Sequence, residues 1–109
     1  MHELSLTRSI VGACAERAGG ARVGRVTLEV GWLTCVMPDA LRFCYDACTE
    51  GTGLEGSKLE IIEIPGRGRC RACGGEVALD DLLSPCSCGS YDLELIAGED
   101  LRIKEMELF

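Results

Sequence analysis

Eight cysteines and a single histidine are the residues of this 109-residue chain best suited to binding a transition-metal ion. Four of the cysteines form two close pairs, Cys70 with Cys73 and, after twelve intervening residues, Cys86 with Cys88. Two such pairs on turns can direct four thiolates at one tetrahedral ion, as in zinc ribbons. Because no histidine lies nearby, we expect an all-sulfur, closed site, which is structural rather than catalytic.

An iron–sulfur centre and a redox disulfide are the alternatives for these cysteines. A redox motif is expected beside a strand–helix junction, whereas this segment has the composition of turns. A module of roughly 25 residues also cannot bury enough apolar surface to fold without a metal or a crosslink. Zinc is therefore the predicted ion.

Gly74 and Gly89 follow the second cysteine of each pair, where we expect the backbone to fold under the sulfurs and donate amide hydrogen bonds to them.

The other four cysteines are scattered among apolar residues: Cys14, Cys35, Cys44 and Cys48. Free cysteine commonly behaves as a small buried apolar residue. We expect that role for this set, with Cys35 at the surface.

The N-terminus offers a second set of metal ligands. His2 stands directly beside Met1, so the terminal amine, the His2 amide and the His2 imidazole are consecutive nitrogens. Tetragonal nitrogen sites suit Ni(II) or Cu(II). A histidine at this position can equally be a solvated tail residue, and these residues alone leave both interpretations open.

Composition restricts the classes of function. The apolar fraction of 47% indicates a globular chain, and no apolar run approaches the ~20 residues that cross a bilayer. The formal charge of -7, with acidic residues in excess in both halves, disfavours nucleic-acid binding. No signal-like leader precedes the first predicted helix, so we expect a reducing, cytoplasmic location.

Enzymatic activity is not expected either. With one terminal histidine, the chain has no Ser/His/Asp or Cys/His arrangement, and it has no phosphate-binding glycine loop. The acidic residues Asp46, Glu50, Glu60 and Glu63 are typical of solvated faces.

The periodicity of apolar residues predicts helices and strands in alternation. Residues 3–18 have a helical stripe that begins with Leu4, and a helix begins again at Pro38. Residues 23–31 and 58–64 have the pattern of strands, so the region is expected to form a βαβ unit with parallel strands. The predicted fold class is α+β: a small mixed β-sheet packed by two helices, with an inserted zinc-ribbon-like module.

Three parts of the chain are expected. Residues 1–65 would form an α/β domain, residues 66–92 the cysteine module, and residues 93–109 strands that return to the first domain's sheet. The proline and glycines of residues 65–69 suggest a hinge into the module. Residues 91–97 and 101–108 suggest a C-terminal hairpin.

Together these segments resemble the HypA/HybF family, nickel metallochaperones for the maturation of nickel-iron hydrogenases. The resemblance spans essentially the whole chain. It is carried by the opening residues 1–5, the strand ending at Gly31, the helix entry at residues 38–41, residues 50–52 and the cysteine module followed by residues 88–90. The opening Met1-His2-Glu3 is its most specific part.

The resemblance implies an α/β nickel domain and a zinc domain. It implies that His2 is the essential nickel ligand, helped by backbone nitrogens near the terminus such as the Met1 amine. Glu3 would contribute its backbone or lie nearby, and the two cysteine pairs would bind zinc. The partners implied are an accessory GTPase and the hydrogenase large-subunit precursor. A monomer–dimer equilibrium is a further expectation.

One departure concerns the second cysteine pair. The commoner family pattern would place a cysteine at position 85, but Pro85 stands there and the cysteine is Cys86.

The alternative function is a zinc-ribbon adaptor or docking protein in which His2 binds no nickel.

Overall fold

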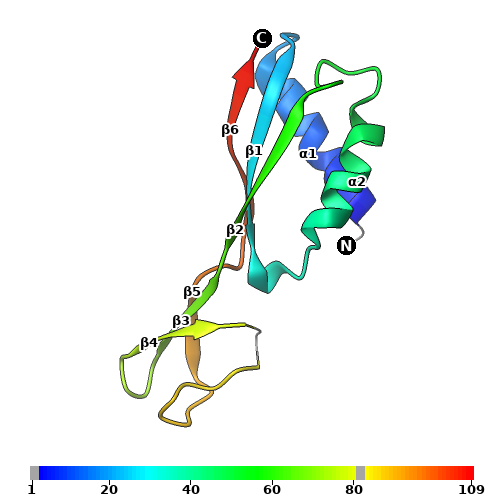
Figure 1. Ribbon diagram of the computed structural model, residues 1–109. Coiled ribbons are helices and arrows are strands. Elements are labelled where there is room, and N and C mark those ends of the chain that lie inside the picture. The colour runs from blue at the N-terminus through cyan, green and yellow to red at the C-terminus, as the bar shows by residue number, and fades with distance from the viewer. Residues whose placement is uncertain (1–2, 81–82) are drawn as a thin grey trace. The chain divides into compact units, whose positions relative to one another are not determined.

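The computed structural model describes residues 3–80 and 83–109. Its elements are α1 (Glu3–Ala18), β1 (Val23–Gly31), the 3-10 helix η1 (Trp32–Thr34), α2 (Pro38–Thr49), β2 (Lys58–Ile64), β3 (Gly66–Cys70), β4 (Glu76–Leu79), β5 (Leu93–Ala97) and β6 (Leu101–Leu108) (Figure 1). The strands form two three-stranded sheets, in the orders β2-β1-β6 and β4-β3-β5.

The chain divides into two compact units. The first contains the chain up to Leu28, Val36–Ile62 and Arg102–Phe109, and the second contains Glu29–Cys35 and Glu63–Leu101. The predicted boundaries at residues 65/66 and 92/93 remain a proposal.

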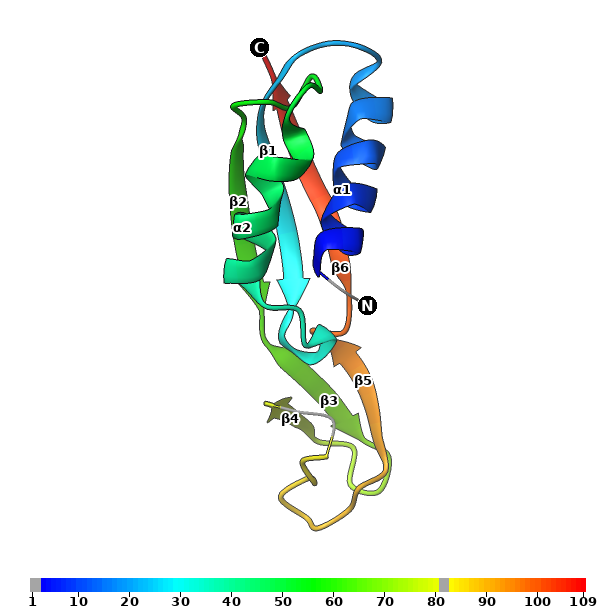
Figure 2. The ribbon, with the colours of Figure 1, turned by 90° about the vertical axis from the view of Figure 1, so that its right-hand side faces the viewer.

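The sheet β2-β1-β6 is mixed, because β1 and β2 run in the same direction and β6 runs in the opposite one (Figure 2). Helix α2 is the crossover between the two parallel strands, and α1 and α2 cover the same face of the sheet. The predicted α+β class, with two helices on a small mixed sheet, is therefore confirmed.

The core of the first unit is aliphatic and lies between the helices and the sheet. Its buried side chains include Ile10, Val11 and Cys14 of α1, Val26 and Leu28 of β1, and Leu41 and Tyr45 of α2. Leu4, which the periodicity placed in this stripe, is 43% exposed. That part of the helix prediction was wrong, and the buried face of α1 begins at Thr7.

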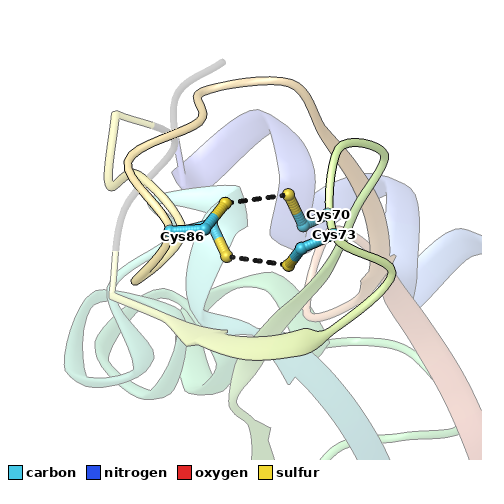
Figure 3. A group of neighbouring side chains, drawn as sticks. Cys70, Cys73 and Cys86 are labelled. Atoms are coloured by element: carbon cyan, nitrogen blue, oxygen red, sulfur yellow. Dashed lines mark hydrogen bonds between the residues drawn. The ribbon is translucent and has the colours of Figure 1, made fainter.

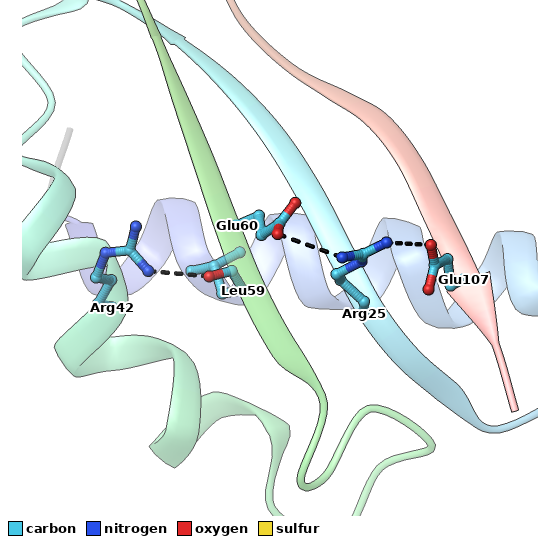
Figure 4. A network of polar contacts seen from close by, with 5 residues as sticks. All are labelled: Arg25, Arg42, Leu59, Glu60 and Glu107. Atoms are coloured by element: carbon cyan, nitrogen blue, oxygen red, sulfur yellow. Dashed lines mark hydrogen bonds and ion pairs between the residues drawn. The ribbon is translucent and has the colours of Figure 1, made fainter.

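Arg25 lies in β1, and its side chain points to the opposite face of the sheet from those of the residues directly before and after it. Its guanidinium donates to Glu60 of β2 at 3.3 Å and to Glu107 of β6, so one side chain spans all three strands (Figure 4). Arg42 of α2 donates to the Leu59 carbonyl at 2.9 Å, which ties the helix to the edge strand. The two ion pairs of Arg25 are open to solvent and therefore contribute little to stability.

The sheet of the second unit is antiparallel. Strand β3 is central: Gly66 pairs with Leu79 of β4, and Cys70 pairs with Leu93 of β5. The predicted hinge at residues 65–69 was therefore wrong, because Gly66–Cys70 is a strand. A Cβ atom on Gly66 would lie 2.4 Å from the Leu79 carbonyl oxygen, so glycine allows close packing here rather than flexibility.

The predicted C-terminal hairpin was also wrong. Strand β5 pairs with β3 in the second sheet, whereas β6 pairs with β1 in the first. Only residues 101–108 return to the sheet of the first unit. Among the described residues, no helix has both the length and the apolar character needed to span a membrane.

Candidate metal centre

The first cysteine pair lies at the end of a strand and in the tight turn that follows it. Cys70 is the last residue of β3, and Cys73 closes the turn at residues 71–73. Gly74, with φ of 78°, donates its N–H to the Cys70 carbonyl at 2.8 Å. The Cys70 N–H donates to the Gly75 carbonyl at 2.8 Å. These two bonds fold the turn back on the strand end and hold both cysteines on it.

The second pair repeats this arrangement without a strand before it. Gly89, with φ of 93°, donates its N–H to the Cys86 carbonyl at 2.8 Å, and the Cys86 N–H donates to the Ser90 carbonyl at 2.8 Å. The left-handed backbone favours glycine at positions 74 and 89. The two glycine amides donate to carbonyl oxygens, and the expected amide hydrogen bonds to sulfur come from their neighbours Cys73 and Cys88.

The two turns bring four sulfur atoms together (Figure 3). The Sγ atoms of Cys70, Cys73, Cys86 and Cys88 all lie within 4.8 Å of one another. Cys70 and Cys88 are 3.6 Å apart, and Cys73 and Cys86 are 3.7 Å apart. Four sulfurs at the ~2.3 Å Zn–S distance from a tetrahedral ion would be separated by roughly 3.8 Å, whereas a disulfide requires about 2.05 Å. The spacing therefore fits a tetrahedral ion and not a disulfide.

Backbone amides favour the thiolate form of two of these cysteines. A hydrogen bond from the Cys73 N–H lowers the pKa of Cys70 to about 6, and one from the Cys88 N–H lowers the pKa of Cys86. The Ser90 N–H lowers the pKa of Cys88, but the neighbouring sulfurs of Cys86 and Cys70 outweigh it and raise that pKa to about 11. Four thiolates this close repel one another unless a cation neutralises them. The donor set thus fits a divalent, thiophilic ion.

The four cysteines form a possible zinc site that leaves no ligand position open for reaction. Cys70 and Cys86 are buried, and Cys73 and Cys88 are exposed. Four sulfur donors complete a tetrahedral zinc shell, so such a site holds structure rather than activating water. Although this cysteine is at position 86 rather than at position 85 of the commoner family pattern, the Cys86 sulfur lies within the cluster.

The predicted nickel ligands are only partly within the described chain. Met1 and His2 lie outside the described residues, and Glu3 is the first residue of α1. The Glu3 carbonyl accepts a hydrogen bond of 2.6 Å from the Thr7 hydroxyl.

The scattered cysteines differ from one another in burial. Cys14 is buried in the core, as expected, and Cys35 is exposed with a positive φ of 60°. Cys44 and Cys48 of α2 are only half-buried, so the expectation that they are core residues was wrong for this pair. Their spacing of four residues is visible in the sequence, where it fits the apolar stripe of α2 and gives no separate sign of a site.

The fold and the site define a small α+β protein with a four-cysteine cluster that could hold a metal ion. The family model described as "Hydrogenase/urease nickel incorporation, metallochaperone, hypA" matches residues 1–108. The chain therefore belongs to the HypA family of nickel metallochaperones for hydrogenase maturation.

Relatives and solved structures agree over the full chain. The hydrogenase maturation factors HypA of Nostoc punctiforme and Geobacter metallireducens are 58% and 50% identical over 108 and 109 residues, with 99% of this chain covered in both and 96% and 99% of the relatives. The solution structure of the Ni metallochaperone HypA from Helicobacter pylori has a TM-score of 0.70 at 20% identity, over 99% of this chain and 97% of that one. At this identity the structural likeness supports the fold alone.

Proposed function

We propose that this protein carries Ni(II) at its N-terminus and delivers it for the maturation of nickel-iron hydrogenase. The family match over residues 1–108 supports this proposal most strongly. The protein acts as a carrier and not as an enzyme.

The proposed nickel ligands are the His2 imidazole, the Met1 amine and backbone nitrogen near Glu3. Glu3 begins α1, and the first N–H groups of a helix have no intrahelical acceptor. Nitrogen at this position is therefore free for another partner, whereas the Glu3 carbonyl already accepts from Thr7. A single imidazole with backbone nitrogens favours the tetragonal geometry of Ni(II) over tetrahedral zinc.

The proposed role of the cysteine centre is permanent zinc binding by Cys70, Cys73, Cys86 and Cys88. Bound zinc would supply the charge that the four thiolates require, and its binding energy would stabilise a sheet too small to fold by burial alone. The two metals are thereby separated by ligand chemistry: sulfur for the resident ion and nitrogen for the one that is delivered.

Delivery requires partners that the chain itself does not supply. We assign nucleotide hydrolysis to an accessory GTPase, because this sequence has no phosphate-binding glycine loop. The hydrogenase large-subunit precursor receives the nickel, in the cytoplasm. A monomer–dimer equilibrium accompanies this role.

The ligand role of the terminal amine is tested by extending the chain. Zinc-loaded protein with a Gly-Ser dipeptide before Met1 is titrated with Ni(II) beside the unextended protein, with zinc content measured in both. The proposal expects the extension to weaken nickel binding without changing the bound zinc. Equal nickel affinity would exclude the amine as a ligand. One zinc and no nickel site in either protein would favour the adaptor function instead.

A further inference from the structure

Helix α2 carries two cysteines that neither the zinc centre nor the N-terminal site uses. Cys44 and Cys48 are four residues apart, so their side chains lie on the same face of the helix, one turn apart. Both are half-buried, in contrast to Cys14, whose thiol is enclosed in the core. The fully buried face of α2 is formed by other residues: Leu41, Tyr45 and Thr49. The two cysteines therefore border the core and are partly exposed to solvent.

These thiols cannot protect each other by forming a disulfide. Residues four apart on a helix have Cβ atoms about 5–6 Å apart, and a disulfide requires about 3.5–4.5 Å. Within the part of the chain that the structure describes, the side chains of Cys44 and Cys48 form no disulfide and no hydrogen bond. The helix thus presents a pair of free thiols at a fixed separation.

We propose that Cys44 and Cys48 form a binding site for a soft monovalent cation, of which Cu(I) is the biological representative. Thiolates select Cu(I). Two metal–sulfur bonds, taken near the ~2.3 Å of Zn–S, span up to about 4.6 Å, which two thiols on Cβ atoms 5–6 Å apart can match.

The coordination number argues against a divalent ion at this site. Among the described residues, the cysteines of the zinc centre are the one group in which three or more ligand atoms come together. A cation held by Cys44 and Cys48 therefore has two protein ligands within residues 3–80 and 83–109. Cu(I) is stable between two thiolates, whereas Zn²⁺ requires four ligands in a structural site. The site is independent of the nickel function, since it uses sulfur ligands on α2 rather than nitrogen ligands at the terminus.

Anaerobic titration with Cu(I) tests the site. Zinc-loaded protein is titrated with ascorbate-reduced copper against a chromogenic Cu(I) chelator, while a zinc dye records any zinc release. We expect one Cu(I) per chain before zinc is released. Cys44→Ser and Cys48→Ser should each lower the Cu(I) affinity at least about 100-fold. Loss of an outer-shell partner already costs a metal site up to about 100-fold, and each of these variants removes a direct ligand. Cys35→Ser, which removes an exposed single thiol, should bind as the wild type does.

Alkylation of the wild-type protein gives a readout that does not depend on how the variants fold. With one equivalent of Cu(I), mass spectrometry should show Cys44 and Cys48 protected from iodoacetamide while Cys35 reacts at its usual rate. The proposal is overturned if the first equivalent of copper releases zinc, if both serine variants keep wild-type affinity, or if copper leaves alkylation of the pair unchanged.

Discussion

Three glycines of the second unit approach one another so closely that no side chain fits. A Cβ atom on Gly31 would lie 2.1 Å from the Gly98 carbonyl oxygen, and one on Gly98 would lie 2.6 Å from the Gly66 Cα atom. These neighbours are backbone atoms, which cannot turn aside as a flexible side chain can. Gly98 also has φ of 85°, a left-handed conformation that other residues adopt at a cost. Glycine at these positions is a packing requirement.

We predict that Gly66→Ala destabilises the protein by about 2 kcal/mol, within the usual range for overpacking. The matched control is Gly12→Ala: Gly12 lies on exposed α1 surface, and a Cβ atom there meets nothing within 4 Å. Alanine at this helix position should stabilise by roughly 0.5–1 kcal/mol. Urea unfolding measures both. A neutral Gly66→Ala would show that β3 can move away from Leu79.

The second cysteine pair makes a residue-scale prediction about zinc. Cys86→Ser should reduce zinc affinity at least about 10-fold, because it removes a direct ligand rather than an outer-shell group. Competition with a chelator measures the affinity, and Cys35→Ser should leave it unchanged. Unaltered affinity in Cys86→Ser would mean that the sulfur 3.7 Å from Cys73 is not a ligand.

At the scale of elements, the apolar periodicity predicted Glu3–Ala18 and Lys58–Ile64 with their observed bounds, and it predicted the start of α2 at Pro38. It failed in the second unit. Strand β3 has the sequence GRGRC, which lacks the β-branched and aromatic residues that mark a strand. Glycine is required in this strand because Leu79 and Leu33 pack directly on its backbone and leave no room for a Cβ atom. A tertiary contact of this kind leaves no signal in the local sequence.

The candidate centre was partly predictable for a related reason. The spacing of Cys70 and Cys73 is typical of a pair of metal ligands. A second close pair follows after twelve residues, an interval typical of zinc sites. The half-buried state of Cys44 and Cys48 was not predictable, because it depends on how α2 rotates against the sheet. Burial of Tyr45 and Thr49 sets that rotation.

One hydrogen bond joins α2 to the segment before β2. The Tyr45 hydroxyl and the Ser57 hydroxyl are buried and lie 2.6 Å apart. We predict that Tyr45→Phe costs about 1 kcal/mol, because it leaves Ser57 without this partner. Tyr91→Phe is the control, since Tyr91 is exposed and should have no effect. Equal stability of the two variants in thermal unfolding would show that the bond contributes nothing.

The same hydroxyl gives this prediction a pH dependence. Burial raises the pKa of Tyr45 above its usual value of 10, so folding favours the protonated form. The stabilisation from Tyr45 should therefore be complete below pH 10 and should diminish as the pH rises further, with no such loss in Tyr45→Phe.

At the scale of the whole molecule, the two units have different sources of stability. The first has a continuous core between two helices and a sheet. The second is a small sheet with the cysteine centre at one end of β3. We predict that removal of zinc with a chelator abolishes amide-exchange protection in β3 and β5 while α1 and α2 remain protected. Simultaneous loss of protection in both units would contradict this division of roles.

The central claim is that His2 holds the nickel that this protein delivers, and calorimetric titration of Ni(II) into zinc-loaded protein tests it most directly. The wild type should bind one nickel ion, with affinity falling below a pH of about 6.5 as the imidazole becomes protonated. His2→Ala should lose nickel binding and keep its zinc. Undiminished nickel affinity in His2→Ala would contradict the account.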